Sequence, residues 1–337
     1  MSPDGRFLDR YDLVILDLDG VVYLVDRPIP AAVSAIARLH TDGPAVAFAT
    51  NNASRSADQV ADLLNGMGIP ARPDEVLTSA AATAALLAER LPPAAPVLVV
   101  GADALRAEVR GAGLTPVSDA ADDPVAVVQG YGPQVGWSDL AEAAVAVRQG
   151  ALWVATNTDR TLPSTRGPLP GNGALVAALG TALDREPDVV VGKPEAALFT
   201  TAARRAGASR PLVVGDRLDT DIEGAVRAGL DSVLVLTGVT TPVDLLAAPP
   251  HRRPTYVASD LSGLFDVDGP VRLSGEEGPV DSGWSVAGDP PVLTGEGRAL
   301  DALTAVCAAA WRSPSVQVAA GSPAARDALG KLGLPAA

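Results

Sequence analysis

The feature that most constrains the fold is an alternation along the chain. Short apolar runs rich in Val, Ile and Leu are followed by longer Ala-rich segments with helical period. Strands buried on both faces read as apolar runs, and crossover helices join them into a parallel sheet. The sequence therefore predicts an α/β fold with a Rossmann-like parallel-sheet core. We expect strands at 13–18, 45–49, 97–100, 126–129, 152–155, 189–191, 212–214 and 232–236, and helices at 30–39, 56–65, 79–91, 138–148, 173–183, 194–206 and 219–228.

The chain is too long for a single core. At 337 residues we expect two or three domains. From about Asp266 the pattern changes, because Gly, Pro and acidic residues crowd together. We therefore expect a small α/β tail domain at 266–337, with helices at 298–311 and 323–331 and a short strand at 316–319.

Composition excludes several classes of protein. The net charge of −14 argues against a nucleic-acid partner or an anionic membrane surface, because both require a basic face. No apolar stretch of membrane-spanning length and no signal peptide is found, so we expect no membrane insertion and a cytoplasmic location. Cys307 is the only cysteine and is expected to be a buried hydrophobe. His40 and His251 are the only histidines, so the sequence gives little support to a Ser-His-Asp catalytic triad or a His-rich metal site.

The sharpest local motif is LVILDLDGVVY, in which an apolar strand ends in Asp17 and Asp19, followed by Gly20. Ligands of parallel sheets bind outside the carboxyl ends of the strands, so both carboxylates are placed at a ligand site. Paired carboxylates favour a hard divalent cation between them. The alternative is that the two aspartates only cap a turn.

Two further strand ends carry groups suited to an anion. In VAFATNNAS a strand ends at Thr50 and Asn51, where a hydroxyl and backbone N–H groups can cradle a phosphate. In GKPE, Lys193 stands between an apolar run and a helix, and only one other lysine, Lys331, occurs in the chain. The alternatives are an ordinary helix cap and an inert surface lysine.

The fourth motif, LVVGDRLDTDIEGA, ends a buried strand in Gly215 and Asp216, with Asp219 and Asp221 at the start of the next helix. Asp216 can supply a further carboxylate to a magnesium site, and Asp221 can orient a metal-bound water or the lysine. The three aspartates can instead be favourable charges at a helix start, a reading that suits Asp219 best.

Together, strands ending in Asp-x-Asp, Thr-Asn, Lys-Pro and Gly-Asp, in this order, resemble the haloacid dehalogenase-like hydrolases over about residues 10–265. The resemblance implies a Mg²⁺-dependent phosphatase with Asp17 as nucleophile and Asp19 as general acid and base. It further implies Thr50, Asn51 and Lys193 as phosphate-binding residues, a metal held by Asp17, Asp216 and the backbone carbonyl of Asp19, and Asp221 behind these ligands. The chemistry is consistent in itself, because a phosphate dianion repels a carboxylate nucleophile unless positive groups neutralise it.

The interval between Asn51 and Lys193 is far longer than one strand-helix-strand step, so it must hold an inserted α/β cap domain. We expect the core at 1–77 and 188–265 and the cap at 78–187. The stretches ATNTDRTLP and PGNGALVAAL resemble the caps of nitrophenyl-phosphatase-like members. Candidate cap residues facing the leaving group are Asn157, Asp159, Arg160 and Asn172, with turn formation and helix capping as the alternative.

A closing cap favours a small phosphorylated metabolite as substrate. Similar enzymes with this cap and an additional tail act on glycerol 3-phosphate in glycerophospholipid recycling, which makes that compound the best single expectation. The alternatives are a broad-specificity phosphatase for nucleoside monophosphates, phosphoglycolate or pyridoxal phosphate, a non-catalytic phosphometabolite-binding module, or an acetyltransferase. The tail resembles part of an acetyltransferase-like fold, but GEGRAL matches a coenzyme A loop poorly, so we expect no transferase activity. Similar caps often dimerise, which implies a homodimer.

Overall fold

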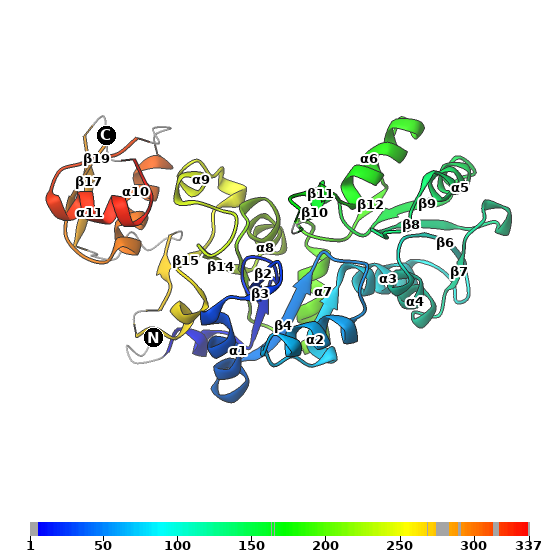
Figure 1. Ribbon diagram of the computed structural model, residues 1–337, viewed down its shortest axis with the longest axis horizontal. Helices are drawn as coiled ribbons and strands as arrows, with labels where there is room; N and C mark the ends of the chain where they lie inside the picture. Colours follow the sequence, from blue (N-terminus) through cyan, green and yellow to red (C-terminus); the bar gives the residue numbers. More distant parts are fainter. Residues whose placement is uncertain are drawn as a thin grey trace. The chain divides into compact units, whose positions relative to one another are not determined.

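The computed structural model describes residues 6–162, 164, 166–267, 269–273, 283–288, 291–312 and 317–335 (Figure 1). The chain divides into two compact units, residues 1–46 with 206–337 and residues 47–205. This division does not test the expected core, cap and tail boundaries, which stay predictions. None of the described residues forms a helix long and apolar enough to cross a membrane.

The first unit is built on a parallel sheet with the strand order β16-β15-β14-β13-β1. The central strand β13 (Pro211–Gly215) lies between β1 (Leu13–Leu16) and β14 (Asp231–Val235), parallel to both. β15 (Tyr256–Ala258) continues the parallel sheet, and β16 (Val271–Arg272) is antiparallel at its edge. Every residue of β1 and β13 is buried, as expected for strands covered on both faces.

Short helices surround this sheet in the first unit. α1 (Pro30–Asp42) begins with Pro30 at its first position, where a missing N–H costs nothing, and runs three residues beyond the expected end. The others are η1 (Phe7–Arg10), the π-helical turn η4 (Leu218–Ile222), α8 (Glu223–Ala228), α9 (Pro242–Leu246), η5 (Pro250–Arg252) and η6 (Leu261–Phe265). A small hairpin, β2 (Tyr23–Leu24) with β3 (Arg27–Pro28), follows β1.

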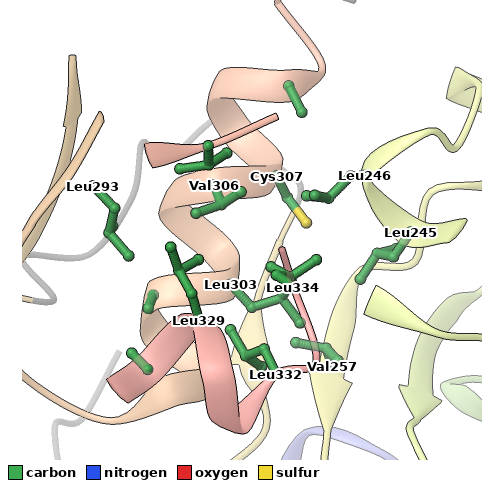
Figure 2. Packing of buried hydrophobic residues seen from close by; sticks show 14 of the residues in the cluster. Leu245, Leu246, Val257, Leu293, Leu303, Val306, Cys307, Leu329, Leu332 and Leu334 are labelled. Carbon is green, nitrogen blue, oxygen red and sulfur yellow. The ribbon is translucent and has the colours of Figure 1, made fainter. Parts of the chain in front are cut away.

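The C-terminal segment of the first unit holds β17 (Trp284–Ala287), β18 (Val292–Gly295), α10 (Ala299–Ala310), β19 (Ala319–Ala320) and α11 (Pro323–Lys331). Both helices were expected, whereas the antiparallel hairpin of β17 and β18 was not. The expected strand 316–319 begins at Val316, outside the described residues, and the strand of the structure ends one residue later. Figure 2 shows Cys307 of α10 facing Leu246 of α9, within a cluster that also contains Leu303, Val306, Leu329, Leu332 and Leu334.

The second unit carries β4 (Ala45–Thr50), parallel to β5 (Val76–Thr78), and a five-stranded parallel sheet with the order β12-β9-β8-β6-β7. These strands are β12 (Val189–Val190), β9 (Leu152–Ala155), β8 (Ala126–Gln129), β6 (Pro96–Val100) and β7 (Thr115–Val117). The helices are α2 (Ala57–Gly66), η2 (Pro73–Glu75), α3 (Ser79–Arg90), α4 (Asp103–Gly111), η3 (Ala120–Asp122), α5 (Trp137–Arg148), α6 (Asn172–Leu183) and α7 (Ala197–Ala206), with a hairpin of β10 (Thr161–Leu162) and β11 (Leu169–Pro170).

Two expected helices begin later than their sequence signals indicate. The helix expected from Pro194 starts at Ala197, because the Glu195 N–H bonds to the Gly192 carbonyl and closes a turn first. The helix expected from Asp219 is preceded by the π-helical turn, in which the Ile222 N–H reaches back to the carbonyl of Arg217. Both differences lie at the end of an expected functional strand. The fold class is α/β, as expected.

Candidate active site

Three carboxylates meet at the carboxyl ends of two neighbouring strands in the first unit. Asp17 follows β1 and Asp216 follows β13, and each strand points to the same edge because the pair is parallel. The Asp17 N–H continues the ladder with a 2.9 Å bond to the carbonyl of Val214. Carboxylate oxygens of Asp17, Asp216 and Asp221 all lie within 4.8 Å of one another. The sequence motifs one and four therefore meet in space.

Backbone groups hold two of these carboxylates in place. The Val239 N–H donates to Oδ2 of Asp216 at 2.7 Å, and the Arg217 N–H donates to Oδ2 of Asp221 at 3.1 Å. Both aspartate side chains are fully buried. The two backbone N–H groups therefore fix the orientation of both side chains. The loop that contains Val239 follows β14, and sequence reasoning did not single it out.

Glycines make room for this arrangement. Gly20 has a φ of +85°, which lets the chain turn back after Asp19 so that the Gly20 N–H bonds to the carbonyl of Tyr23. The Thr237 hydroxyl donates to the Gly20 carbonyl at 2.5 Å and joins this turn to the loop after β14. The run LTGVTT, with a glycine just beyond an apolar strand, is the sequence signal that could have indicated this loop.

Asp19 and Asp219 stand apart from the three-carboxylate cluster. Asp19 is exposed, one residue beyond Leu18 in the turn, and its side chain is outside the cluster. Asp219 pairs with the Arg217 guanidinium at 2.9 Å. Burial alone would raise the pKa of Asp219, but the hydrogen bond and charge of Arg217 outweigh burial and hold that pKa below its ordinary value. Asp219 is thus engaged with Arg217.

The cluster fits a hard divalent cation. Its donors are carboxylate oxygens, which are the ligands that Mg²⁺ prefers, and they are close enough to share one ion. Buried carboxylates repel each other at such distances unless positive charge lies between them. The donor chemistry therefore agrees with the expected Mg²⁺ cofactor.

In the second unit, Asn51 joins two of the remaining motifs. Asn51 Oδ1 accepts the Lys193 N–H at 2.8 Å, and Asn51 Nδ2 donates to the Lys193 carbonyl at 3.1 Å. Lys193 is 3 % exposed, and its ammonium lies 3.5 Å from the carbonyl of Ala49 in β4. The buried Thr50 hydroxyl accepts the N–H of Asn52 at 3.1 Å. The stretches VAFATNNAS and GKPE therefore lie side by side.

The four candidate cap residues differ in what their side chains touch. The amide of Asn172, which is fully buried, donates to the Asn157 carbonyl at 2.7 Å. The amide of Asn157 donates to the Asn51 carbonyl at 2.6 Å, and the Asp159 carboxylate accepts from Asn51 Nδ2 at 3.1 Å. Arg160 is exposed. Burial thus favours Asp159 and Arg160 over Asn157 and Asn172 as substrate contacts.

Comparison with family models divides the chain into three matches. A model described as haloacid dehalogenase-like hydrolase matches residues 14–115, and a related hydrolase model matches residues 190–264. These two ranges contain the candidate site residues of all four motifs. A model described as a GCN5-related N-acetyltransferase-like domain matches residues 282–334.

Curated relatives and solved structures agree with these matches. The chain is 45% identical over 333 residues to D-glycerol 3-phosphate phosphatase of Mycobacterium tuberculosis, covering 95% of this chain and 93% of the relative. An acid sugar phosphatase of Staphylococcus aureus is 35% identical and covers 76% of this chain and 97% of its own length. The crystal structure of the M. tuberculosis glycerol phosphate phosphatase with magnesium superimposes with a TM-score of 0.90 at 45% identity, covering 98% of this chain and 99% of that one. A 4-nitrophenylphosphatase from Thermotoga maritima gives 0.71 at 32% identity, over 76% of this chain and 97% of its own.

Proposed function

Because this chain belongs to the haloacid dehalogenase-like hydrolase family, we propose that it is a Mg²⁺-dependent phosphatase that releases phosphate from glycerol 3-phosphate. The observation that carries the substrate is the extent of the similarity. The M. tuberculosis glycerol phosphate phosphatase matches 98% of the chain, whereas the acid sugar and nitrophenyl phosphatases match only 76%. A shared tail and shared cap favour a shared substrate.

The reaction begins at Asp17, whose carboxylate attacks phosphorus and displaces the glycerol oxygen, leaving an aspartyl-phosphate. Asp17, Asp216 and the backbone carbonyl of Asp19 would hold Mg²⁺, which would supply positive charge to offset the repulsion between the phosphate and the carboxylates. Asp221 accepts the Arg217 N–H at 3.1 Å and keeps the loop after β13 in register behind these ligands.

Asp19 is the proposed general acid and base. Its side chain is exposed and separate from the buried carboxylates, so it can exchange protons with substrate and water. In the first step it protonates the departing alkoxide, and in the second it takes a proton from the water that attacks the aspartyl-phosphate. The free phosphate leaves with Asp17 regenerated.

The transferring phosphoryl group is held by Thr50 and Lys193. The hydroxyl of Thr50 donates to a phosphate oxygen, and the Lys193 ammonium stabilises charge that builds up in the transition state. On the cap, Asp159 and Arg160 are the proposed contacts to the leaving group. Glycerol offers hydroxyl groups, which a carboxylate and a guanidinium can bind by hydrogen bonds.

A phosphate-release screen tests this proposal. Glycerol 3-phosphate, a nucleoside monophosphate, phosphoglycolate and pyridoxal phosphate are compared side by side with and without Mg²⁺. We expect the highest kcat/KM for glycerol 3-phosphate and no turnover without the metal. Equal turnover of all four compounds would support the broad-specificity alternative and overturn the glycerol 3-phosphate assignment.

Asp17→Asn separates an enzyme from a phosphometabolite-binding module. We expect it to lower kcat by about 10³-fold or more while the fold survives. The matched control is Asp231→Asn at the amino end of β14, where the carboxylate accepts the Tyr11 hydroxyl at 2.8 Å. This variant should keep wild-type turnover, since ligands of parallel sheets bind at the opposite ends of the strands.

Location, assembly and the tail are further parts of the proposal. The net charge of −14 and the lone, buried Cys307 suit a cytoplasmic enzyme, and a homodimer is the proposed assembly. Light scattering after gel filtration should give twice the 34.1 kDa chain mass. For the segment that matches the acetyltransferase-like model, we expect no acetyl transfer, which acetyl-coenzyme A consumption would measure.

A further inference from the structure

The side chain of Asn51, the first residue after β4, bonds to the backbone of Lys193. Its amide makes two hydrogen bonds to the backbone of Lys193, one to the N–H and one to the carbonyl, across 142 residues of sequence. The partners fix the orientation of the amide, because Oδ1 faces a donor and Nδ2 faces acceptors. A two-bond clamp of this kind determines where the Lys193 backbone lies.

The same amide also reaches the loop that follows β9. Asn51 Nδ2 donates to both carboxylate oxygens of Asp159, at 3.1 and 3.2 Å. The carbonyl of Asn51 accepts the Ser79 hydroxyl and the Asn157 amide, each at 2.6 Å. Asn51 therefore links the end of β4, the start of α3, the loop after β9 and the turn before α7 that contains Lys193.

The chain packs closely against the Asn51 amide oxygen. A Cβ atom built on Gly192 would lie 2.6 Å from Asn51 Oδ1 and 2.6 Å from the carbonyl of Thr156. Real Cβ atoms do not approach that closely, so only glycine fits between the two oxygens. With its oxygen and nitrogen both engaged, the side chain is directed toward Lys193 and Asp159.

We propose that Asn51 is a positioning residue that sets the Lys193 ammonium and ties it to Asp159, instead of binding phosphate through its own side chain. This inference rests on the proposed function, in which Lys193 stabilises the transferring phosphoryl group. Displacement of the Lys193 ammonium should reduce the stabilisation of the transition state more than it reduces the binding of substrate. The reason is that negative charge builds up while the phosphoryl group is transferred. Loss of the clamp should therefore lower kcat more than it raises KM.

The chain offers a matched control for the clamp. Asn65 in α2 bonds in the same way to the backbone of Ala71, donating to its carbonyl at 2.9 Å and accepting its N–H at 3.2 Å. Asn51→Ala and Asn65→Ala each remove one such clamp. We expect Asn51→Ala to lower kcat for p-nitrophenyl phosphate about 10²-fold with KM changed less than about threefold, and Asn65→Ala to leave both unchanged. Equal losses of activity that follow the fall in Tm would overturn the proposal.

The contact to Asp159 is tested by exchanging the two side chains. Asn51→Asp places a carboxylate against that of Asp159 and should be the most impaired variant. The double variant Asn51→Asp with Asp159→Asn restores an N–H···O pair, although not the bond to the Lys193 carbonyl. We expect it to regain about tenfold in kcat over Asn51→Asp alone. If kcat does not recover in the double variant, the contact between Asn51 and Asp159 is not part of the clamp.

A measurement that needs no activity keeps this inference separable from the proposed function. With only two lysines, ¹⁵N-lysine labelling gives two backbone amide signals, and Lys331→Arg identifies that of Lys193. Asn51→Ala should shift the Lys193 signal and accelerate its hydrogen exchange about tenfold, while Asn65→Ala should not. An unchanged Lys193 amide in Asn51→Ala overturns the clamp. A wild-type protein that hydrolyses no phosphate monoester overturns the proposed function instead.

Discussion

Gly238 lies so close to Asp216 that a Cβ atom built on this glycine would be 2.0 Å from Oδ2 of the aspartate. Asp216 cannot easily move away, because its side chain is fully buried and the N–H of Val239 holds the same oxygen at 2.7 Å. The loop after β14 thus shapes one carboxylate of the cluster without contributing a ligand of its own.

Replacing Gly238 should therefore disturb metal binding. We predict that Gly238→Ala raises the Mg²⁺ concentration for half-maximal activity by about 10- to 100-fold, the range found when groups that orient metal ligands are changed. A Mg²⁺ titration of phosphate release measures this. The control is Gly330→Ala in α11, where no atom lies within 4 Å of the added Cβ. An unchanged Mg²⁺ dependence in Gly238→Ala would contradict this prediction, because it would mean that the loop moves and leaves Asp216 in place.

The three-carboxylate cluster should also couple Mg²⁺ to stability. Oxygens of Asp17, Asp216 and Asp221 within 4.8 Å repel one another without a cation. We predict that Mg²⁺ at about 100 times its dissociation constant stabilises the wild-type fold by about 2.7 kcal/mol. Asp216→Asn should lose most of this gain and, without Mg²⁺, be at least as stable as the wild type. Thermal unfolding with and without EDTA tests both points, and an equal gain in Asp216→Asn contradicts them.

Sequence periodicity predicted the longer buried strands closely and missed several short ones. β8 and β9 have the predicted bounds, and the strands before Asp17 and Asp216 were predicted within two residues at each end. Continuous burial gives such strands an unbroken apolar pattern. The strand β5 was missed because three buried residues carry too little pattern. β7 and the hairpin of β17 and β18 were missed because three or four residues of mixed burial show neither an apolar run nor a clear alternation.

The approach of Asp17, Asp216 and Asp221 to one another could be expected, because each directly follows or closely succeeds a recognisable strand, while their roles in binding a metal stay a prediction. The contacts of Asn51 could not, since its amide bonds to Lys193 and Asp159, both more than 100 residues away. A motif states which residue type stands at a strand end, but tertiary packing decides whether its side chain faces the substrate or the chain itself. Thr237 and Gly238 were missed for the same reason.

Asp12 gives the fold a pH dependence outside the site. Its carboxylate joins the start of β1 to the start of β13 by accepting the N–H of Ser209 at 2.9 Å, the hydroxyl of Ser209 at 2.9 Å and the N–H of Arg210 at 2.8 Å. Burial acts to raise the pKa of Asp12, but these hydrogen bonds outweigh burial and hold that pKa below its ordinary value of 3.8. The stabilising contribution is therefore present above that pH and is lost as the pH falls through the folded-state pKa.

We predict that Asp12→Asn lowers the free energy of unfolding by about 1 kcal/mol at pH 7, and that this difference shrinks below about pH 4. Urea unfolding at a series of pH values measures it. Asp26→Asn serves as the control, because the Asp26 side chain is 72% exposed. A difference between Asp12→Asn and wild type that stays constant down to pH 3 would contradict the assignment.

Cys307 should report whether the C-terminal segment opens. The thiol is fully buried in α10, and Figure 2 shows it facing Leu246 of α9. Burial raises the pKa of Cys307 to about 12, against the smaller opposing effect of the Arg253 charge, so almost no reactive thiolate is present at pH 8. We predict that Ellman's reagent labels the folded protein negligibly and labels one thiol per chain in denaturant. Labelling at an intermediate rate is expected only under conditions in which α10 separates from α9. Rapid stoichiometric labelling of the folded protein would mean that this contact opens readily in solution.

Cys307→Ser should lower the free energy of unfolding by about 1–3 kcal/mol, because it buries a hydroxyl among leucines, and Cys307→Ala should lower it less.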